Sequence, residues 1–461
     1  MGKARKTSFR LATLAAASAL LIGACSSGGG SASSDDADNA DSGDSGSTSQ
    51  ESGDSGERIN LTLQHMETPP ERVDAFQQVI DDFNASQDQY FVEQQTVGWG
   101  EAYTQAVAQI EAGQAPDMLQ AIPAFMTTIR ATGGVQPATN IFNDLAADYE
   151  FIPSMVDQYN WDDEMWAIPA FGMVEGLWYN KQHFAEAGLE PPTTWSEMLA
   201  AAEALTTDGK YGVALPLGDS FATLQSIYTW MGVNGGEDIY DDQCQPIVDT
   251  SSNVETFDFI NKLRVFSPPD SVSYQWPEVE NALVSGNASM ITFKGSFLRG
   301  WLENSGLSAD DLGVVPIPRP DGGTEDFSLS YSNAFMVMTD DAEKQEGIEE
   351  FMRFYLDDEN YGQWLATAEP GLFLPVTTTA TDSASYTGGE IISQFPDQMA
   401  EQVEINGDSA LYGFTQSAYC PQVGEFEGQF LAAKAVERMV VNEETPEQAV
   451  AWLQSEMESI G

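Results

Sequence analysis

The sequence predicts an α/β protein with two lobes. Strand-like and helix-like stretches alternate along the chain from residue 58 onward, which is typical of sheets covered by helices. The stretch from residue 58 to residue 461 also exceeds the size at which one hydrophobic core normally stops growing, about 250–300 residues. We therefore expect two cores, each built on a mainly parallel sheet flanked by helices.

The first part of this stretch shows the alternation most clearly. Ile59, Leu61 and Leu63 alternate with polar residues as in a strand, and apolar residues at helical spacing follow Pro70. A second strand at 90–97, a helix near 103–110 and a third strand at 117–119 extend the pattern to β-α-β-α-β.

Parallel strands joined by helical crossovers place a ligand crevice beyond their carboxyl ends. In this chain those ends fall at 65–68, 98–101 and 120–125. We expect residues of these three loops to face a ligand.

Two later helices are indicated by their start signals. Thr194 is followed three residues later by Glu197, which can reach back toward the start of the helix. Thr445, Pro446 and Gln448 give the same signal near the end of the chain. These signals predict helices from about 195 and 446.

The N-terminal region predicts export and lipidation. Basic residues precede an apolar run, Leu11 to Ala24, that is too short to span a bilayer permanently, so 1–24 is read as a signal peptide. Small residues before Cys25 are typical of a site where the cysteine receives palmitate-type acyl chains, which anchor a protein to the membrane. Residues 25–57 have no aliphatic side chain larger than alanine and predict a disordered acidic tether. The alternative is an ordinary secretion signal with an incidental cysteine.

The chain is strongly acidic. It has 72 acidic and 18 basic residues, a net charge of -54, and four of the basic residues lie in the predicted signal peptide, which leaves a mature charge near -58. Such a surface repels nucleic acid and anionic lipid, so no nucleic-acid partner is expected. A saline or alkaline habitat, where salt screens the charges, and simple solubility are both open explanations.

Cys244 and Cys420 remain once Cys25 is assigned to the lipid. An even remainder usually pairs in an oxidising compartment, so a Cys244–Cys420 disulfide is expected.

Several classes of function are disfavoured. Only His65 and His183 are present, and phosphate-binding, dinucleotide-binding and EF-hand motifs do not occur, so we expect no metal, no cofactor and no enzyme activity. A secreted glycoside hydrolase stays open as an alternative because two carboxylates suffice for that chemistry, although the rhythm of eight strand-helix units is missing. A surface adhesin on the same two lobes is a further alternative.

One set of segments carries a resemblance to a known family. The segments are Trp166-Ala167-Ile168-Pro169, Leu177-Trp178-Tyr179-Asn180-Lys181, Phe184, Ala187-Gly188-Leu189, Pro192, Thr194-Trp195 and Glu197-Met198-Leu199, supported by 113–117, 284–290, 315–318 and 347–355. In this order the chain resembles the extracellular solute-binding proteins of carbohydrate-uptake ABC transporters, family 1, the group that includes maltose-binding protein.

The resemblance implies a two-lobed periplasmic-binding-protein fold of type II. Residues 58–168 with 332–375 would form the N-lobe, and residues 169–331 with 376–461 the C-lobe, joined by crossings near 168–171, 327–332 and 373–376. It also implies a monomer, anchored by lipid on the outer face of the membrane, that closes on a sugar and delivers it to the permease subunits of an ABC importer. A non-sugar solute, such as a peptide, a polyamine or a metal chelate, is the alternative within this class.

A sugar site needs flat aromatic surfaces and polar groups for the hydroxyls. Carried over by position, the loop after 290–293 supplies Lys294, Gly295, Phe297 and Arg299, with Phe297 where relatives often place a stacking tryptophan. Maltose-binding relatives carry tryptophan, aspartate and arginine where this chain has Gln120, Ala121 and Phe125, which argues against a malto-oligosaccharide. The other candidates are Met66, Glu67, Trp99, Phe171, Glu175, Asp219, Ser220, Trp230, Tyr331, Glu369 and Phe373. For each aromatic the alternative is a core position, and for each acid a solvated surface.

Overall fold

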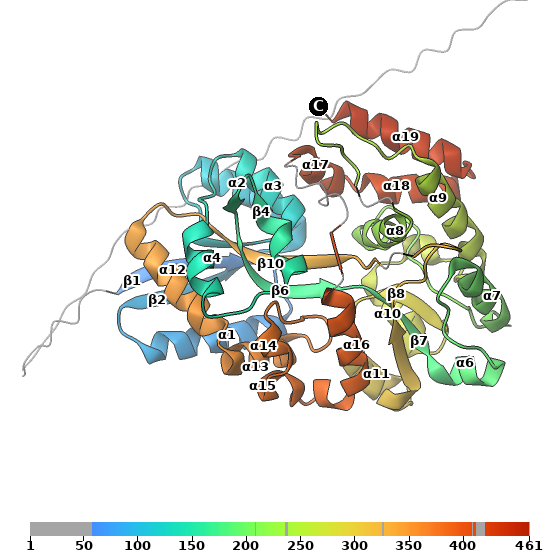
Figure 1. Ribbon diagram of the computed structural model, residues 1–461, viewed down its shortest axis with the longest axis horizontal. Helices are drawn as coiled ribbons and strands as arrows, with labels where there is room; N and C mark the ends of the chain where they lie inside the picture. The colour runs from blue at the N-terminus through green and yellow to red at the C-terminus, as the bar shows by residue number, and fades with distance from the viewer. Residues whose placement is uncertain are drawn as a thin grey trace, which may run out of the picture. The chain divides into compact units, whose positions relative to one another are not determined.

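The computed structural model describes residues 58–207, 209–235, 238–324, 327–407, 409–411 and 420–460 (Figure 1). The predicted signal peptide, the tether and Cys25 lie outside these residues. The described chain builds two main sheets, one of five strands and one of three, and a short hairpin of β4 (Asn160–Trp161) and β5 (Glu164–Met165).

The five-stranded sheet is half parallel. Its strands in spatial order are β2 (Tyr90–Thr96), β1 (Ile59–His65), β3 (Met118–Ala121), β10 (Ser330–Val337) and β6 (Ile168–Val174). β1 pairs in parallel with β2 and β3, as the β-α-β-α-β pattern predicts, whereas β10 is antiparallel to both β3 and β6. The expected alternation at the start of the chain is thus confirmed, and the sheet as a whole is mixed.

The three-stranded sheet corrects the expectation of a second mainly parallel sheet. Its order is β8 (Met290–Phe293), β7 (Gly176–Asn180) and β9 (Leu312–Val315), and β7 is antiparallel to both neighbours. Among the described residues, parallel pairing with this sheet is limited to isolated bridges, such as Ala214 with Ile291. The stretch around 211–215 therefore lies beside β8 without forming a regular strand.

Helices cover both sheets. They are α1 (Pro70–Ser86), α2 (Trp99–Glu111), α3 (Pro123–Ala131), α4 (Thr139–Ala146), α5 (Pro153–Val156), α6 (Lys181–Ala187), α7 (Trp195–Leu205), α8 (Phe221–Val233), α9 (Ser251–Leu263), α10 (Trp276–Val284), α11 (Leu298–Asn304), α12 (Ala342–Tyr355), α13 (Asp358–Ala368), α14 (Thr378–Thr381), α15 (Ala384–Thr387), α16 (Pro396–Gly407), α17 (Gln422–Gly428), α18 (Leu431–Val441) and α19 (Pro446–Ser459). Within the described part of the chain, none of them is both long and apolar enough to cross a membrane.

The predicted helix starts are confirmed. Thr194 accepts a hydrogen bond from the backbone N–H of Glu197 at the start of α7, and the Glu197 carboxylate reaches back to Thr193. At α19, Thr445 and Gln448 form a reciprocal capping box. Each cap satisfies backbone donors that the first turn of a helix leaves without an intrahelical partner.

Buried apolar side chains form two clusters, and each cluster contains residues of both sheets. The strand β7 contributes side chains to both clusters. Leu177 and Tyr179 belong to one cluster and Trp178 to the other, because successive side chains of a strand point to opposite faces. The clusters therefore correspond to the two faces of the sheets, continuous from one sheet to the other.

The two sheets are connected where β6 and β10 run side by side (Figure 1). β6 passes into β7 through the single residue Glu175, so one continuous segment contributes a strand to each sheet. A third segment lies beside β6, because Gly172 and Leu374 exchange backbone hydrogen bonds of 2.8 and 2.9 Å. These three segments coincide with the crossings implied by the family resemblance.

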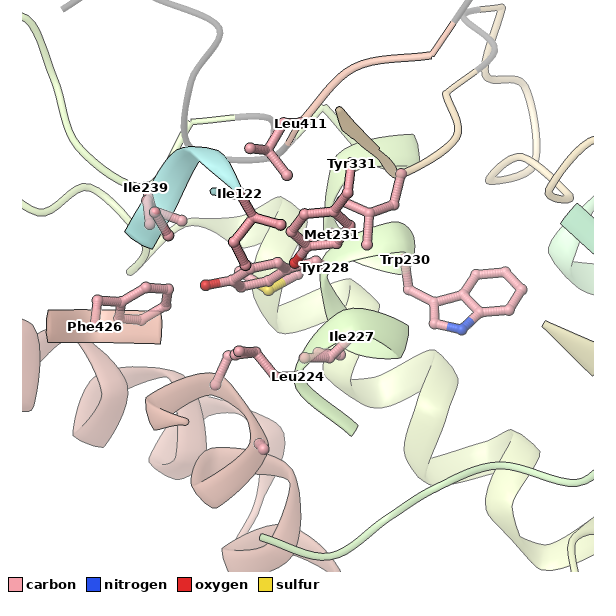
Figure 2. Close-up of a cluster of buried hydrophobic side chains, with 14 of the residues drawn as sticks. Ile122, Leu224, Ile227, Tyr228, Trp230, Met231, Ile239, Tyr331, Leu411 and Phe426 are labelled. Atoms are coloured by element: carbon pink, nitrogen blue, oxygen red, sulfur yellow. The ribbon is translucent and has the colours of Figure 1, made fainter. Parts of the chain in front are cut away.

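A disulfide and α17 connect distant parts of the chain. The disulfide joins Cys244 to Cys420, whose Cα atoms are 5.4 Å apart and whose sequence separation is 176. In α17, Phe426 stacks on Tyr228 of α8 with ring centroids 5.9 Å apart, and Figure 2 shows Ile122, at the start of α3, in the same cluster. The approach of α17 to α3 requires a glycine, since a Cβ on Gly424 would lie 2.3 Å from the Thr128 hydroxyl.

α17 also buries a carboxyl group. Glu427 is 2% exposed, and its Oε1 atom has no hydrogen-bond partner among the described residues. Burial raises the pKa of Glu427 to about 8, because the charged form is deprived of water. The folded protein thus retains a proton on Glu427 that the unfolded chain releases above about pH 4.3.

This proton makes stability depend on pH. Between about pH 4.3 and the folded pKa of about 8, the folded state binds more protons than the unfolded state, so the free energy of unfolding falls as pH rises, by at most about 1.4 kcal/mol per unit. We predict that Glu427→Gln removes this component. Urea unfolding at pH 5 and pH 8 should show a larger loss of stability on alkalisation for the parent than for the variant. Parallel pH profiles would contradict it.

Candidate functional site

A cavity of about 360 Å³ lies at the junction of the two sheets. Its lining residues are Glu67, Arg72, Trp99, Ile122, Met173, Phe221, Gln225, Trp276, Pro277, Glu280, Phe293, Lys294, Ser296, Tyr331, Asn333, Glu369 and Leu372. Each of the three predicted strand-end loops contributes one residue, namely Glu67, Trp99 and Ile122. The cavity is therefore where the carboxyl ends of β1, β2 and β3 predict a ligand.

The lining is rich in aromatic surface. Trp99 begins α2, Tyr331 lies on β10, and Phe221 on α8 packs edge-to-face on Trp276 of α10 with centroids 5.6 Å apart. The Trp276 indole N–H donates to Gln225 Oε1 at 3.1 Å, which fixes the orientation of its ring. Trp99 and Trp276 are only partly buried, so each leaves ring surface available to a ligand.

One polar network surrounds Arg72. Its guanidinium bonds Glu67 at 2.7 Å and Glu369 at 3.0 Å. Gln120 donates to Glu67 Oε1 at 3.0 Å and thereby fixes that carboxylate from behind. The guanidinium also lies over Phe373, 5.1 Å from its centroid. Burial raises the pKa of Glu369, and Arg72 opposes that rise.

A second network surrounds Lys294, which directly follows β8. Its ammonium bonds Glu175 at 3.0 Å and Gln225 at 2.8 Å. The other Glu175 oxygen accepts from Thr229 at 2.6 Å. Both charged side chains are almost fully buried, with exposures of 6% and 3%, so this pair is isolated from water. Because Gln225 also holds Trp276, the same network orients an aromatic wall of the cavity.

A third carboxylate, Glu280 on α10, is bonded to the Ser296 hydroxyl. Burial raises the pKa of Glu280, and this hydrogen bond opposes the rise. Asn333 on β10 completes the polar lining. Its carbonyl oxygen accepts from Gln120 at 2.9 Å, while its Nδ2 atom is buried without a partner among the described residues.

Backbones also meet close to the site. A Cβ on Gly295 would lie 2.3 Å from the carbonyl oxygen of Gly371, and Gly371 has a φ of +89°, a left-handed conformation that disfavours side chains. The loop after β8 and the loop after α13 can therefore touch only because both residues are glycines. Gly295 is thus a packing residue, whatever it contacts in a ligand.

The structure brings part of the predicted set to the cavity. Those in the lining are Glu67, Trp99, Lys294, Tyr331 and Glu369. Those that support or adjoin lining residues are Met66, Gln120, Glu175, Gly295 and Phe373.

The remaining predicted residues lie elsewhere. They are Ala121, Phe125, Phe171, Asp219, Ser220, Trp230, Phe297 and Arg299. Trp230 packs edge-to-face on Trp195, and Phe297, the residue expected to stack on a ligand, packs edge-to-face on Trp178. Both rings lie in the buried clusters. Ala121, Phe125 and Phe171 are also buried in the clusters, Asp219 and Arg299 are exposed, and Ser220 caps α8.

Most residues of the cavity lining were not among the predicted site residues. Ile122 lies in the predicted loop 120–125, and Leu372 lies between the predicted Glu369 and Phe373. The missed residues are Arg72, Met173, Phe221, Gln225, Trp276, Pro277, Glu280, Phe293, Ser296 and Asn333. A signal existed for some of them. Trp276 and Glu280 are one helical turn apart on α10, and Phe221 and Gln225 are one turn apart on α8, so each pair shares a helix face. Arg72 is also one of the few bases of this acidic chain.

No group of three or more His, Cys, Asp or Glu side chains that could hold a metal ion occurs in the part of the chain that the structure describes. The two sheets, one mixed and one antiparallel, are joined by crossing segments and have a polar and aromatic cavity at their junction, which is the arrangement of the α/β periplasmic-binding-protein fold.

The chain belongs to the bacterial extracellular solute-binding proteins, whose family pattern matches residues 69–362. This is a family of binding proteins, which agrees with the expectation that the chain is not an enzyme.

Three curated relatives illustrate the family. They are the putative ABC transporter periplasmic-binding protein YcjN of Escherichia coli (23% identical), the probable amino-acid ABC transporter periplasmic-binding protein y4oP of Sinorhizobium fredii (26%) and the sn-glycerol-3-phosphate-binding periplasmic protein UgpB of Pectobacterium atrosepticum (24%). The matches cover 61%, 65% and 61% of this chain, and 64%, 64% and 65% of the relatives. The chain thus spans just under two thirds of their length.

Solved structures share the fold. The cyclic α-maltosyl-1,6-maltose binding protein of Arthrobacter globiformis superposes with a TM-score of 0.73 at 19% identity, covering 88% of this chain and 99% of that protein. Maltose-bound MalE3 of T. maritima gives 0.71 at 15% identity, covering 87% and 100%. At these identities the likeness concerns the fold alone.

The buried Lys294–Glu175 pair yields a stability prediction. Lys294→Met leaves Glu175 as a buried charge without a counter-ion and should cost about 3–5 kcal/mol in the free energy of unfolding. Adding Glu175→Gln removes that charge, so the double variant should recover part of the loss. Urea unfolding of the three proteins measures both effects.

Lys262 provides the matched control, because it pairs with Asp258 at an exposed position. Lys262→Met should change the free energy of unfolding by about 0.5 kcal/mol or less. A double variant no more stable than Lys294→Met would contradict the assignment of the cost to an unpaired carboxylate.

Proposed function

We propose that this protein captures a mono- or oligosaccharide outside the cell and delivers it to the permease subunits of an ABC importer. The observation that carries the proposal is the cavity of about 360 Å³, in which aromatic side chains stand among carboxylate, amide and hydroxyl groups. A pyranose ring presents apolar C–H faces that pack on aromatic rings, and a rim of hydroxyls that needs such polar partners.

The fold neighbours support a sugar. The two similar structures described above are named for, or contain, maltose-type saccharides, although neither identifies the ligand of this chain. Among the curated relatives, YcjN is named as an ABC transporter protein, which supports the proposed delivery to an importer.

We propose further that capture involves closure of two lobes, 58–168 with 332–375 and 169–331 with 376–461. Both groups of residues line the cavity, for example Asn333 from the first and Glu280 from the second. A ligand that contacts both walls binds the closed arrangement better and shifts the population toward it. The protein would act as a monomer, since one chain supplies both walls.

The binding prediction uses protein that lacks residues 1–57. We expect calorimetry with a broad saccharide panel to find a ligand with a dissociation constant in the micromolar range or tighter, about -8 kcal/mol. Trp276→Ala should weaken the best ligand by about 2 kcal/mol, or about 30-fold, because it removes an aromatic wall. Trp452→Ala is the control, since that indole lies on Arg438 outside the cavity lining.

A panel without any binding saccharide would refute the sugar assignment. Equal losses for Trp276→Ala and Trp452→Ala would instead remove the cavity as the binding site.

The proposed location is the outer face of the membrane, with 1–24 removed, Cys25 acylated and 25–57 as the tether. We predict that Cys25→Ser moves the full-length protein from the membrane fraction to the soluble fraction of a bacterial host. Mass spectrometry of the parent should find acyl chains on the N-terminal cysteine. An unmodified cysteine, or a variant that stays with the membrane, would contradict the anchor.

A further inference from the structure

The charged side chains of the cavity differ in whether they have a partner of opposite charge. Arg72 and Lys294 are the basic side chains among its lining residues, and both are already engaged by carboxylates. Arg72 contacts Glu67 and Glu369, and Lys294 contacts Glu175. An anionic ligand would have to displace a carboxylate from one of these bases, which leaves that carboxylate buried and unpaired.

Glu280 is in the opposite situation. Its bonded partner among the described residues is the neutral hydroxyl of Ser296. Arg72 and Lys294 act on it only from beyond ion-pair distance, where they oppose the rise in its pKa without forming a bond to it. Burial raises the pKa of Glu280, which reflects the cost of a carboxylate with little water. A cationic group entering the cavity would reduce that cost.

The neighbour of Glu280 suits the same kind of ligand. Trp276 lies one turn earlier on α10, and both side chains line the cavity. An indole face attracts a cation through its ring quadrupole, and a carboxylate attracts it through charge. One helix face thus presents both groups that bind an ammonium next to a sugar ring.

Asn333 offers a hydrogen-bond donor from which a hydroxyl or carbonyl oxygen of a ligand could accept. Asn333 is 1% exposed and lines the cavity, and its Nδ2 donor has no partner among the described residues. A buried donor of this kind costs free energy unless a ligand oxygen or a water accepts from it. One wall of the cavity therefore favours a cation, at Glu280, and the other favours a hydrogen-bond acceptor, at Asn333.

We propose that the ligand is an amino sugar, a saccharide with a protonated amine that binds Glu280 beside Trp276. This inference rests on the proposed sugar-binding function and specifies its substrate class. The ring hydroxyls face Asn333 and the other polar groups, and the ammonium forms an ion pair with Glu280. Neither Arg72 nor Lys294 needs to release its own carboxylates.

The test compares matched sugars in calorimetry with protein that lacks residues 1–57. The probes are glucosamine, galactosamine and glucosamine oligosaccharides of two to four units, each beside its N-acetylated form and its parent hydroxyl sugar. We expect an amine to bind the parent protein at least 10-fold tighter than both matched sugars. Glu280→Gln should weaken the amine by about 30-fold or more and leave the neutral sugars within about 3-fold.

Glu303→Gln is the matched control, because Glu303 is exposed on α11 and this substitution removes the same formal charge as Glu280→Gln. It should leave all affinities unchanged, and the unfolding midpoint of Glu280→Gln should be no lower than that of the parent, since the variant removes a carboxylate that is costly to bury. Neutral sugars that bind as tightly as their amines, or equal losses for both in Glu280→Gln, would overturn the amino-sugar assignment and leave the sugar-binding function intact. Spermidine is added to the probes as an amine without a sugar ring, and its binding without binding of any saccharide would overturn both.

Discussion

The pairing of β6 with β10 is the constraint on which the rest of the structure depends. β6 continues into the second sheet through Glu175, and Gly172 bonds Leu374, so three distant segments are fixed to one another at one place. The same two strands place Met173, Tyr331 and Asn333 in the cavity. The backbone hydrogen bonds that join the sheets therefore also determine where the ligand site lies.

Two of the chain's few bases, Arg72 and Lys294, lie at this junction in spite of an extreme negative charge. With 72 acidic residues in the chain, most acids are tolerable only where water and salt screen them. A buried carboxylate needs a partner, and Arg72 and Lys294 supply it for those around the cavity, with Glu280 as the exception. Because the surrounding carboxylates are paired with bases, the carboxylate of Glu280 is the one that a cationic group of a ligand can pair with.

The sequence predicted what depends on local order. The alternation at β1 and the capping residue Thr194 fix local structure through side-chain period and one hydrogen bond, and the carboxyl-end rule placed the ligand near Glu67, Trp99 and Ile122. It could not predict the antiparallel insertion of β10, which comes from a segment more than 200 residues after β3. Nor could it separate Trp276, at the cavity, from Trp230, in the core, since both lie on helices whose rotation is set by distant packing partners.

The two charged networks have a consequence for closure. Arg72 and its partners Glu67 and Glu369 lie in the proposed first lobe, and Lys294 and Glu175 lie in the second. Movement of one lobe against the other therefore leaves these ion pairs intact, and the lobes meet near the site through the side-chain-free Gly295 and Gly371. Opening would instead have to part α17 from α3, which belong to different proposed lobes and pack together at Gly424 and Thr128. A ligand held by both walls adds to these contacts in favouring the closed arrangement. A ligand that satisfied only Asn333 or only Glu280 would bind without closing the protein.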